Sequence, residues 1–434
     1  MNILIVHNKY QIPGGEDVVV ENEVAMLRKH GHKVVLYIRN NSEFSEGSRL
    51  EKGLMYMESF FSVRAYRDTC RLIRKKKIDV VHVHNTVHRI SPSVFYAAVR
   101  MGVPVVQTLH NFRMVCPGAT LYRNGHICEE CIKAHKTCGC CAYGGYLPSI
   151  SHTCYRGSRL QTAAVVLSLE LQKISGIWGK IHYICLTDFN KEKLQCLNRT
   201  GKKALIPAAH IYVKPNFTPD PAADSASGVI NKSTSLTETS ETTDGRAAEL
   251  LHTIGLSQKE KYYIALGRLE RIKGTHLMVK AFARSGKTLV MVGTGEQEDA
   301  IRKYLEKHHI TNIRLAGQLP HGDAMKLLSK AEALVICPQL YETFGMNVAE
   351  AFSLGIPVIS NNVGNAASLV TDGVTGVKCE NSASSLYQAL ERFEKTGRQA
   401  LSDNAREEYE KKYSEEKNYA LLMGIYDKVI NRAK

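Results

Sequence analysis

Short apolar runs alternate along the chain with longer segments in which apolar residues recur every three or four positions. The short runs predict buried strands, and the longer segments predict amphipathic helices. In the first half, the predicted strands are 2–7, 33–38, 79–84, 103–108, 182–186 and 211–214. In the second half, they are 262–266, 288–292, 312–316, 333–337, 356–360 and 375–378. Strand, helix and strand at this spacing predict an α/β fold with parallel, doubly wound sheets.

Helices are predicted in the gaps between these strands, over 16–30, 92–101, 159–178 and 188–198. Near the end of the chain, apolar side chains recur as one helical stripe. The stripe consists of Leu421, Leu422, Ile425, Tyr426, Val429 and Ile430. We therefore expect an amphipathic helix at the carboxyl end.

The composition changes abruptly after Phe217. The segment 218–247 is rich in Ser, Thr, Ala and Asp and has few large apolar residues, so it cannot offset the entropy lost on ordering. We interpret it as a flexible linker insertion. It divides a first domain, 1–217, from a second domain, 248–412, with a final segment 413–434.

One stretch of the second domain concentrates the candidate chemistry. Tyr341 to Glu350 reads YETFGMNVAE and lies between two predicted strands, with a helix expected to begin at Gly345. The first N–H groups of a helix have no intrahelical partner and carry partial positive charge, so this position favours a phosphate. Glu342 precedes the helix and Glu350 lies on a later turn, so they could hold two parts of one ligand. Taken alone, they could equally be a helix cap and a solvated charge.

Two neighbouring turns strengthen the ligand interpretation. Residues 267–274, GRLERIKG, follow one predicted strand, and residues 292–296, VGTGE, follow the next. Glycines with cations or carboxylates after three strands are expected where a nucleotide lies across the strand ends.

The order G-R-L-x-x-x-K-G, V-G-x-G, E-x-F-G-x-x-x-x-E and G-x-P-V-I resembles the GT-B retaining glycosyltransferases of family 4. The resemblance covers nearly the whole chain. It implies a GT-B fold, in which two Rossmann-like domains with doubly wound parallel sheets face a central cleft. It also implies that the last helix, within 413–434, crosses back to the first domain.

The resemblance assigns roles to residues of these motifs. Arg268 and Lys273 would bind the donor diphosphate, together with Gly345 and with Gly15 in the glycine turn Gly14-Gly15. Glu342 would be a catalytic residue that contacts hydroxyls of the donor sugar. The remaining donor contacts, to ribose or sugar, would come from Glu350, Phe344, Met346, Asn347 and Gly293.

His110 follows the predicted strand 103–108, where the ligand crevice of such a sheet opens. A lone histidine is usually structural, but the resemblance places the family's active-site histidine here. We expect His110 to hydrogen-bond the donor sugar and to stabilise charge near the reacting centre. His84 and Asn85 could line the acceptor side or could pack internally.

Seven of the 12 cysteines fall within an insertion over about 112–155. In a cytosolic protein such a cluster favours a metal over disulfides. The preferred ligands of a structural zinc ion are Cys116, Cys128, Cys131 and Cys154, since Cys128 and Cys131 have the spacing of a chelating pair. Cys138, Cys140 and Cys141 leave the choice of ligands open, and an iron–sulfur cluster or free thiols are alternatives.

The net charge of +15 and the pI of about 9.2 favour anionic partners. Arg64, Arg67, Arg71 and Arg74 recur at helical spacing, which indicates either a solvated face or contact with an anionic membrane surface. Nucleic acid is a less favoured partner, because no stacking aromatics interleave with the basic residues and no recognition motif of the helix-turn-helix or finger type is present. The chain also shows neither a membrane span nor a signal peptide, so we expect it in the cytoplasm or peripherally on the inner face of the cytoplasmic membrane.

These observations predict a retaining transferase that moves a sugar from a nucleoside diphosphate donor, UDP first and GDP second, to a glycan or lipid-linked oligosaccharide. Its role would be in cell-surface polysaccharide or O-antigen biosynthesis. No Asp-x-Asp triad accompanies the motifs, so we expect no cofactor and no metal in catalysis. The alternatives are a non-catalytic scaffold of a polysaccharide assembly complex and an epimerase or phosphorylase of the same fold.

Overall fold

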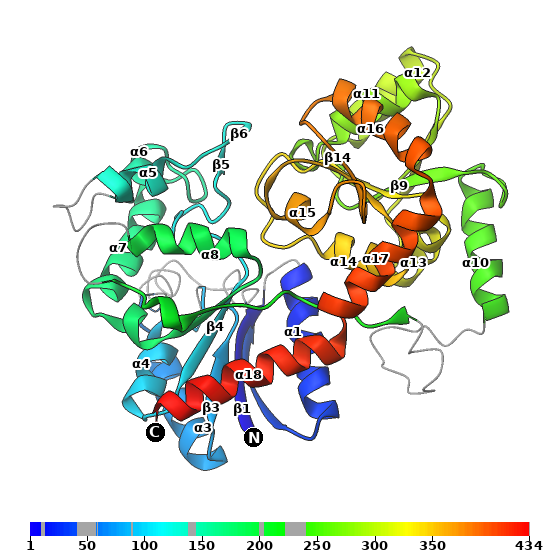
Figure 1. Ribbon diagram of the computed structural model, residues 1–434. Helices are drawn as coiled ribbons and strands as arrows, with labels where there is room; N and C mark the ends of the chain where they lie inside the picture. The colour runs from blue at the N-terminus through cyan, green and yellow to red at the C-terminus, as the bar shows by residue number, and fades with distance from the viewer. Residues whose placement is uncertain are drawn as a thin grey trace. The chain divides into compact units, whose positions relative to one another are not determined.

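The computed structural model describes residues 1–9, 14–40, 58, 60–87, 90–137, 145–198, 204–221 and 240–433. They form two compact units, and each contains a six-stranded sheet (Figure 1). Unit 1 consists of Met1–Arg123, Cys128–Asn216 and Asn418–Lys434, and unit 2 of Asn124–Ile127 and Phe217–Lys417. All registered pairs in both large sheets are parallel, which confirms the predicted α/β class.

The sheet of unit 1 has the strand order β2-β1-β3-β4-β7-β8. Its strands are β1 Asn2–Lys9, β2 Lys33–Asn40, β3 Val80–Val83, β4 Val105–Leu109, β7 His182–Cys185 and β8 Ile211–Val213. The central strands are mainly buried and apolar, as expected for a parallel sheet that is covered on both faces, with His82 of β3 and Thr108 of β4 as buried polar exceptions. Ile3, Leu4, Ile5 and Val6 of β1, for example, have no exposed surface.

Helices cover this sheet. They are α1 Gly15–Lys29, α3 Val63–Lys76, α4 Ser93–Arg100, α5 Glu130–Thr137, α6 Leu147–Ser151, α7 Arg159–Ile174, α8 Asp188–Gln195 and α18 Glu415–Ala433, with short 3-10 helices η2 Ile177–Lys180, η3 Cys196–Asn198 and η4 Ala208–His210. A small hairpin joins β5 Tyr122–Arg123 to β6 His126–Ile127. From Asn418 onward, α18 belongs to unit 1, and it crosses the front of β1 and β3 in Figure 1.

Unit 2 has the strand order β11-β10-β9-β12-β13-β14. The strands are β9 Tyr262–Leu266, β10 Thr288–Val292, β11 Ile313–Gly317, β12 Leu334–Ile336, β13 Val358–Asn361 and β14 Gly376–Cys379. The helices are α10 Ser240–Thr253, η5 Arg271–Lys273, α11 Thr275–Ser285, α12 Glu298–Lys307, α13 His321–Lys330, α14 Met346–Ser353, α15 Gly364–Leu369, α16 Ala383–Thr396 and α17 Arg398–Lys412.

Both strand orders contain a point where the chain reverses its direction of travel across the sheet. In unit 2 this point lies between β9 and β12, and in unit 1 between β1 and β3. In open parallel sheets, ligands bind in the crevice outside the carboxyl ends of the strands at such a switch point. The fold therefore indicates where to look for a site in each unit.

Several expected elements differ from the structure. The helix expected over 159–178 ends at Ile174 because Gly176 adopts a left-handed φ of 70°. Leu421, assigned to the buried stripe of the last helix, is 44% exposed, whereas Leu422, Ile425, Tyr426 and Val429 are buried. Of the expected linker 218–247, residues 240–247 belong to α10, and 222–239 lie outside the described residues.

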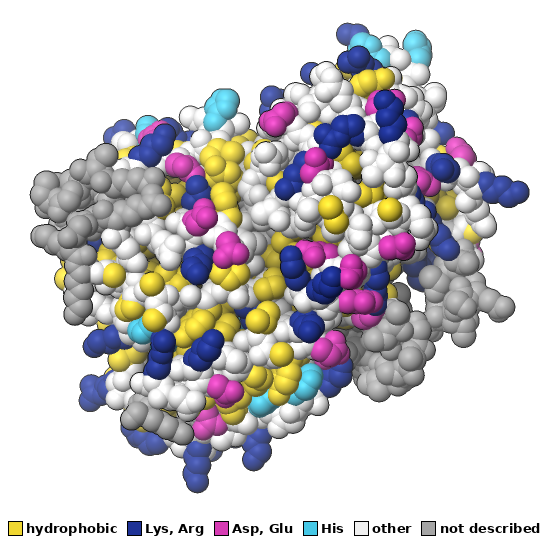
Figure 2. All heavy atoms as spheres, viewed as in Figure 1, with side chains coloured by type: hydrophobic (Ala, Val, Ile, Leu, Met, Phe, Trp, Pro, Cys, Tyr) yellow, Lys and Arg dark blue, Asp and Glu magenta, His cyan; other side chains and the backbone are white. Residues whose placement is uncertain are grey.

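The predicted arginine stripe lies on one helix, α3. Ala65, Thr69 and Ile73 form its buried face, while the four arginines and Lys75 to Lys77 are exposed. Lys and Arg side chains gather at the lower edge of Figure 2, where Figure 1 places α3. Asp68 lies 3.1 Å from Arg71 and 3.9 Å from Arg64, so this face is only partly neutralised. Among the described helices, none is long and apolar enough to cross a membrane.

Gly376 offers a test of the sheet of unit 2. A Cβ at this position would lie 1.9 Å from the carbonyl oxygen of Val358 on the neighbouring strand. We expect Gly376→Ala to lower the free energy of unfolding by on the order of 1–3 kcal/mol, because the strands must separate. Urea denaturation followed by circular dichroism measures this loss.

Gly424→Ala is the matched control. A Cβ at Gly424, on the exposed side of α18, meets nothing within 4 Å. It should raise the free energy of unfolding by about 0.5–1 kcal/mol, because alanine loses less backbone entropy in a helix. Equal destabilisation by both substitutions would contradict the packing described here.

Candidate active site

In unit 2, a cavity opens at the switch point, between the ends of β9 and β12. Five of the predicted donor-binding residues line this cavity, namely Arg268, Lys273, Glu342, Gly345 and Asn347. They come from two separate turns, after β9 and after β12, so the fold brings together motifs that are distant in sequence. A loop after one strand and a helix N-terminus after another thus share one concave surface.

The charges of this cavity are partly paired with one another. Lys273 Nζ lies 2.5 Å from Glu342 Oε1, with side-chain exposures of 36% and 23%. Arg268 forms an ion pair with Glu270, and its side chain is 69% exposed. Both cations therefore reach solvent, and an incoming anion can compete for them.

Glycines allow the turns to approach each other. Gly267 has a φ of 134° and Gly293 a φ of 129°, and a Cβ on Gly293 would lie 2.1 Å from the carbonyl oxygen of Gly267. Gly274 has a φ of 72°, and a Cβ there would lie 2.0 Å from the carbonyl oxygen of Cys337. These glycines are required by the packing of the loops at the switch point.

Helix α14 begins directly after Gly345, whose φ of 112° favours glycine. Asn347 Nδ2 donates to the carbonyl oxygen of Leu266 at the end of β9 and ties the helix to the first turn, 2.8 Å away. Buried Asn365 donates to the carbonyl oxygens of Glu342 and Thr343, at 2.6 and 3.1 Å. The motif analysis missed Asn365, because its role depends on a contact between two loops.

Other predicted donor residues do not line the cavity. Phe344 is buried and packs on Tyr413, with ring centroids 5.9 Å apart, so only its backbone could contact a ligand. Glu350 lies on α14, 3.2 Å from His321 Nε2, and this hydrogen bond raises the pKa of His321. Gly293 and Met346 are also absent from the cavity wall among the described residues.

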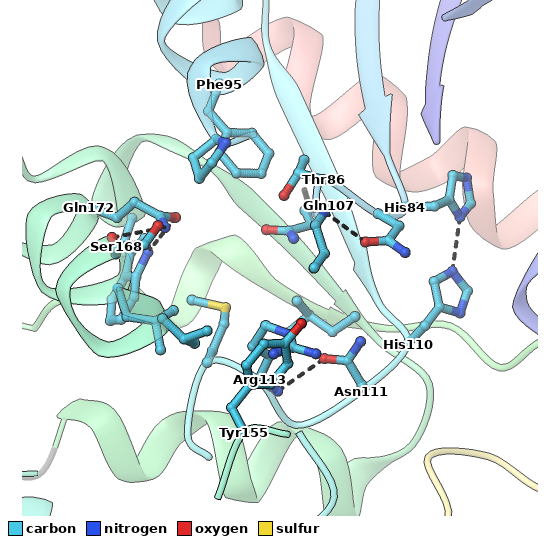
Figure 3. A pocket seen from close by; sticks show the side chains of 18 of the residues that line it. His84, Thr86, Phe95, Gln107, His110, Asn111, Arg113, Tyr155, Ser168 and Gln172 are labelled. Carbon is cyan, nitrogen blue, oxygen red and sulfur yellow. Dashed lines mark hydrogen bonds between the residues drawn. The ribbon is translucent and has the colours of Figure 1, made fainter. Parts of the chain in front are cut away.

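His110 of unit 1 borders a second pocket, which lies between β4, α4 and α7 (Figure 3). Phe95, Leu169 and Trp178 supply apolar surface to this pocket. Amide side chains supply hydrogen-bonding groups, namely those of Asn85, Gln107, Asn111, Gln161 and Gln172. Uncharged amides beside apolar surface suit a ligand that carries many hydroxyls.

His110 is hydrogen-bonded to His84, with Nε2 of His110 and Nδ1 of His84 2.9 Å apart (Figure 3). Burial, followed by the neighbouring His84, holds the pKa of His110 well below its usual range. Burial likewise lowers the pKa of His84 to about 4, with His82 adding to the effect. Both rings are therefore neutral at pH 7.

Beneath these rings lies Glu23 of α1, a buried carboxylate that the motif analysis did not identify. Burial acts to raise its pKa, but His82 and Lys214 outweigh burial and hold the pKa well below the usual range. Its position on the apolar face of α1, between Val20 and Val24, was the available signal, since a buried acid there needs partners.

Gly15 is the first residue of α1, and Pro13 lies outside the described residues. A Cβ on Gly14 or on Gly15 would meet nothing within 4 Å. Asp17 accepts from the Gly14 amide at 3.0 Å and contacts His7 Nε2 at 2.8 Å, which fixes the turn. Neither glycine is required by packing of the described residues.

The four predicted zinc ligands line one small cavity, together with Arg123, Glu130 and His152. Burial and the neighbouring thiols raise the pKa of Cys131 to about 12. Among the described residues, Glu23, His82 and His84 form the only group of three or more whose ligand atoms all lie within 4.8 Å of one another, so no three of the four sulfur atoms lie that close together. Cys138, Cys140 and Cys141 lie outside the described residues.

Two family models match the chain. Residues 13–126 match the family described as Glycosyltransferase Family 4, and residues 249–408 match Glycosyl transferases group 1. Glycogen synthase of Mycobacterium tuberculosis is 37% identical over 120 residues, which is 26% of this chain and 29% of that protein. O-antigen chain mannosyltransferase C of Escherichia coli is 25% identical over 187 residues, covering 42% of this chain and 49% of that protein. The matched segment thus spans less than half of either relative.

Solved structures match the whole chain at low identity. A glycosyltransferase of Rickettsia africae gives a TM-score of 0.65 with 15% identity and covers 99% of both chains. The Anabaena protein HepE, solved in complex with UDP and glucose, gives a TM-score of 0.61 with 14% identity, covering 99% of this chain and 100% of that one. These likenesses confirm the predicted GT-B fold.

Proposed function

We propose that this chain, a GT-B glycosyltransferase of family 4, transfers a sugar from a nucleoside diphosphate sugar to a hydroxyl of a glycan, with retention of configuration. The observation that carries the proposal is the cavity at the switch point of unit 2, which gathers Arg268, Lys273, Glu342 and the start of α14. A nucleoside diphosphate needs both cations and helix amides, and this cavity offers them together.

Arg268 and Lys273 would stabilise the negative charge that develops on the departing diphosphate. Lys273 would exchange its contact with Glu342 for a phosphate oxygen, which frees Glu342 to accept hydrogen bonds from the donor sugar. Glu350 would hold the ribose hydroxyls. Two protein cations in this position supply the charge that a divalent metal supplies in other transferases, so we propose metal-independent catalysis.

In unit 1, His110 would contact a hydroxyl of the reacting sugars, and the amide-lined pocket beside it would take the glycan acceptor. HepE was solved with UDP and glucose, so UDP-sugars come first in a donor panel and GDP-sugars second.

Turnover of a panel of UDP-, GDP-, ADP- and dTDP-sugars tests the proposal. One donor should be consumed with release of its nucleoside diphosphate, and Arg268→Ala should lower turnover on the order of 10²–10³-fold, because the leaving group loses a cation. EDTA should leave turnover unchanged. The matched control is Arg302→Ala, which removes an exposed arginine that pairs with Glu298 on α12 and should have no effect.

A folded protein that consumes no donor would support the non-catalytic scaffold instead. Loss of turnover in EDTA that added Mg²⁺ or Mn²⁺ restores would contradict metal-independent catalysis. An effect of Arg302→Ala as large as that of Arg268→Ala would contradict the placement of the diphosphate site.

We further propose that the acceptor is a lipid-linked oligosaccharide of cell-surface polysaccharide or O-antigen biosynthesis, reached at an anionic membrane. The exposed arginines of α3 support contact with acidic lipids. Leu160, Leu167, Leu171 and Ile174 of α7 recur at helical spacing and are 81, 47, 49 and 63% exposed. Helix α4 connects the two, because it packs on α3 and its Tyr96 hydroxyl lies 2.7 Å from Ser175 Oγ after α7.

Sedimentation with liposomes tests the membrane proposal. The protein should sediment with anionic vesicles at low salt and not with zwitterionic vesicles, since each basic residue contributes on the order of 1 kcal/mol. Changing Arg64, Arg67, Arg71 and Arg74 to Glu should release it. The same charge change at exposed Arg302, Lys303, Lys307 and Lys330 of unit 2 is the control and should release it far less. Equal release by both variants, or no binding at low salt, would rule out a docking role for α3.

We propose that Cys116, Cys128, Cys131 and Cys154 hold a structural zinc ion. They line one cavity, and an ion would draw the sulfur atoms together and favour their thiolate forms. Four thiolates leave no open coordination position, so the ion would order the insertion and take no part in transfer.

Metal analysis of the purified protein checks the zinc proposal. We expect about one zinc per chain, as in other closed four-thiolate sites, and its loss in the double variant Cys128→Ser with Cys131→Ser. Cys70→Ser, on α3 and away from this cavity, should keep the metal. Iron with visible absorbance, or no bound metal, would contradict a zinc site.

A further inference from the structure

A buried cluster of titratable side chains lies beneath His110 in unit 1. It joins four elements, because Glu23 comes from α1, His82 and His84 from the end of β3, Lys214 from the end of β8, and Asn418 from α18. Each of these five side chains is at least nine-tenths buried. Charged groups are costly to bury, so each of them needs a partner that compensates its charge.

One oxygen of the Glu23 carboxylate is held by Lys214, whose Nζ lies 3.2 Å from Oε2. Lys214 also donates to Asn418 Oδ1 at 2.8 Å, and Asn418 Nδ2 donates to the carbonyl oxygen of Pro215 at 2.6 Å. An ammonium group can only donate hydrogen bonds, so the atom of residue 23 that faces Lys214 must be an acceptor.

The other oxygen faces the histidines. Glu23 Oε1 lies 3.0 Å from His82 Nδ1 and 3.3 Å from His84 Nε2. His82 has further neighbours, since Nδ1 lies 2.7 Å from the Tyr426 hydroxyl and Nε2 lies 2.8 Å from Thr108 Oγ1. His84 Nε2 makes no hydrogen bond of good geometry in the described part of the chain, and the carboxylate 3.3 Å away is the group that favours a proton on it.

The tautomer of His84 determines that of His110. A carboxylate favours a proton on His84 Nε2, and in a neutral imidazole this makes Nδ1 an acceptor. The partner of Nδ1 is His110 Nε2, at 2.9 Å, which must therefore donate. A neutral His110 protonated at Nε2 carries its lone pair on Nδ1.

We propose that Glu23 acts through His84 as a positioning residue that fixes His110 in the Nε2-protonated tautomer, so that His110 Nδ1 accepts a hydrogen bond from a substrate hydroxyl. The proposal rests on the proposed transferase function, in which His110 contacts a sugar hydroxyl. His82 and His7 also lie near the ring of His84, and burial lowers the pKa of His7. The carboxylate of Glu23, 3.3 Å from His84 Nε2, is the anion through which we expect the pair to be oriented.

A metal ion at Glu23, His82 and His84 is the competing interpretation of this cluster. Their ligand atoms lie within 4.8 Å of one another, as a cation site requires. The Lys214 ammonium on the same carboxylate opposes a cation, and the Nδ1 atom of His82 that faces Glu23 also faces the Tyr426 hydroxyl. The cluster is better explained as a network of hydrogen bonds and ion pairs.

Glu23→Gln should reverse the direction of the hydrogen bonds from residue 23 through His84 to His110, because glutamine has nearly the same shape as glutamate but carries an NH2 group. Lys214 would retain the amide oxygen, because it needs an acceptor, and the amide NH2 would then point to the histidines. His84 would accept at Nε2 and donate from Nδ1, and His110 would be left with its proton on Nδ1. Histidine ¹⁵N chemical shifts report each tautomer, with signals assigned from His84→Gln and His110→Gln.

In the wild-type protein we expect Nε2–H at both His84 and His110, and in Glu23→Gln we expect Nδ1–H at both. Turnover of Glu23→Gln should fall on the order of 100-fold at nearly unchanged donor KM, because the hydroxyl loses its acceptor while donor binding in unit 2 is intact. The tautomers are measured without any substrate, so they test the network even if no donor is turned over, and a failure of the proposed function is recognised separately.

Tyr426→Phe is the control, because it removes a hydroxyl from His82 on the same network without touching His84. It should lower thermal stability and leave the His110 tautomer and turnover unchanged. Nδ1–H at His110 in the wild-type protein would overturn the proposal. So would an unchanged tautomer in folded Glu23→Gln, or a bound metal ion that Glu23→Gln removes.

Discussion

The two candidate sites depend on one topological constraint, the parallel direction of the strands in each large sheet. Crossover helices bring every strand back in the same direction, so the loops that follow the strands meet at one edge. Where the order reverses, adjacent loops turn to opposite faces and leave a crevice between them. In unit 2 the crevice lies between β9 and β12 and holds Arg268, Lys273 and the start of α14. In unit 1 the reversal lies between β1 and β3, and His84 follows β3.

The cavity of unit 2 could be predicted from the sequence because its features are local. Gly267, Gly274 and Gly345 each mark a turn with positive φ, and the cations and carboxylates stand beside them in the chain. Periodicity also located all twelve strands of the two large sheets, because buried parallel strands are short and apolar. It failed at Gly176, where a single left-handed residue ends α7 within a segment that remains apolar.

The buried network of unit 1 could not be predicted in the same way. Lys214 and Glu23 are separated by 191 positions, and Lys214 and Asn418 by 204, so their contact exists only after the sheet and α18 have assembled. Asn365 is a similar case, since it closes the loop before α14 from another helix. The role of a buried charge depends on the groups that it contacts, and a sequence pattern does not identify those groups. The two sites therefore differ in kind, with exposed, exchangeable charges in unit 2 and buried, fixed charges in unit 1.

The central claim is that the charges of unit 2 form the binding site of a nucleoside diphosphate. A crystal structure of the protein with UDP tests it most directly. The account predicts that the diphosphate contacts Arg268, Lys273 and the first amides of α14, and that Lys273 has left Glu342, which lies 2.5 Å from it in this structure. UDP bound away from this cavity, or within it while the contact between Lys273 and Glu342 persists, would contradict the account.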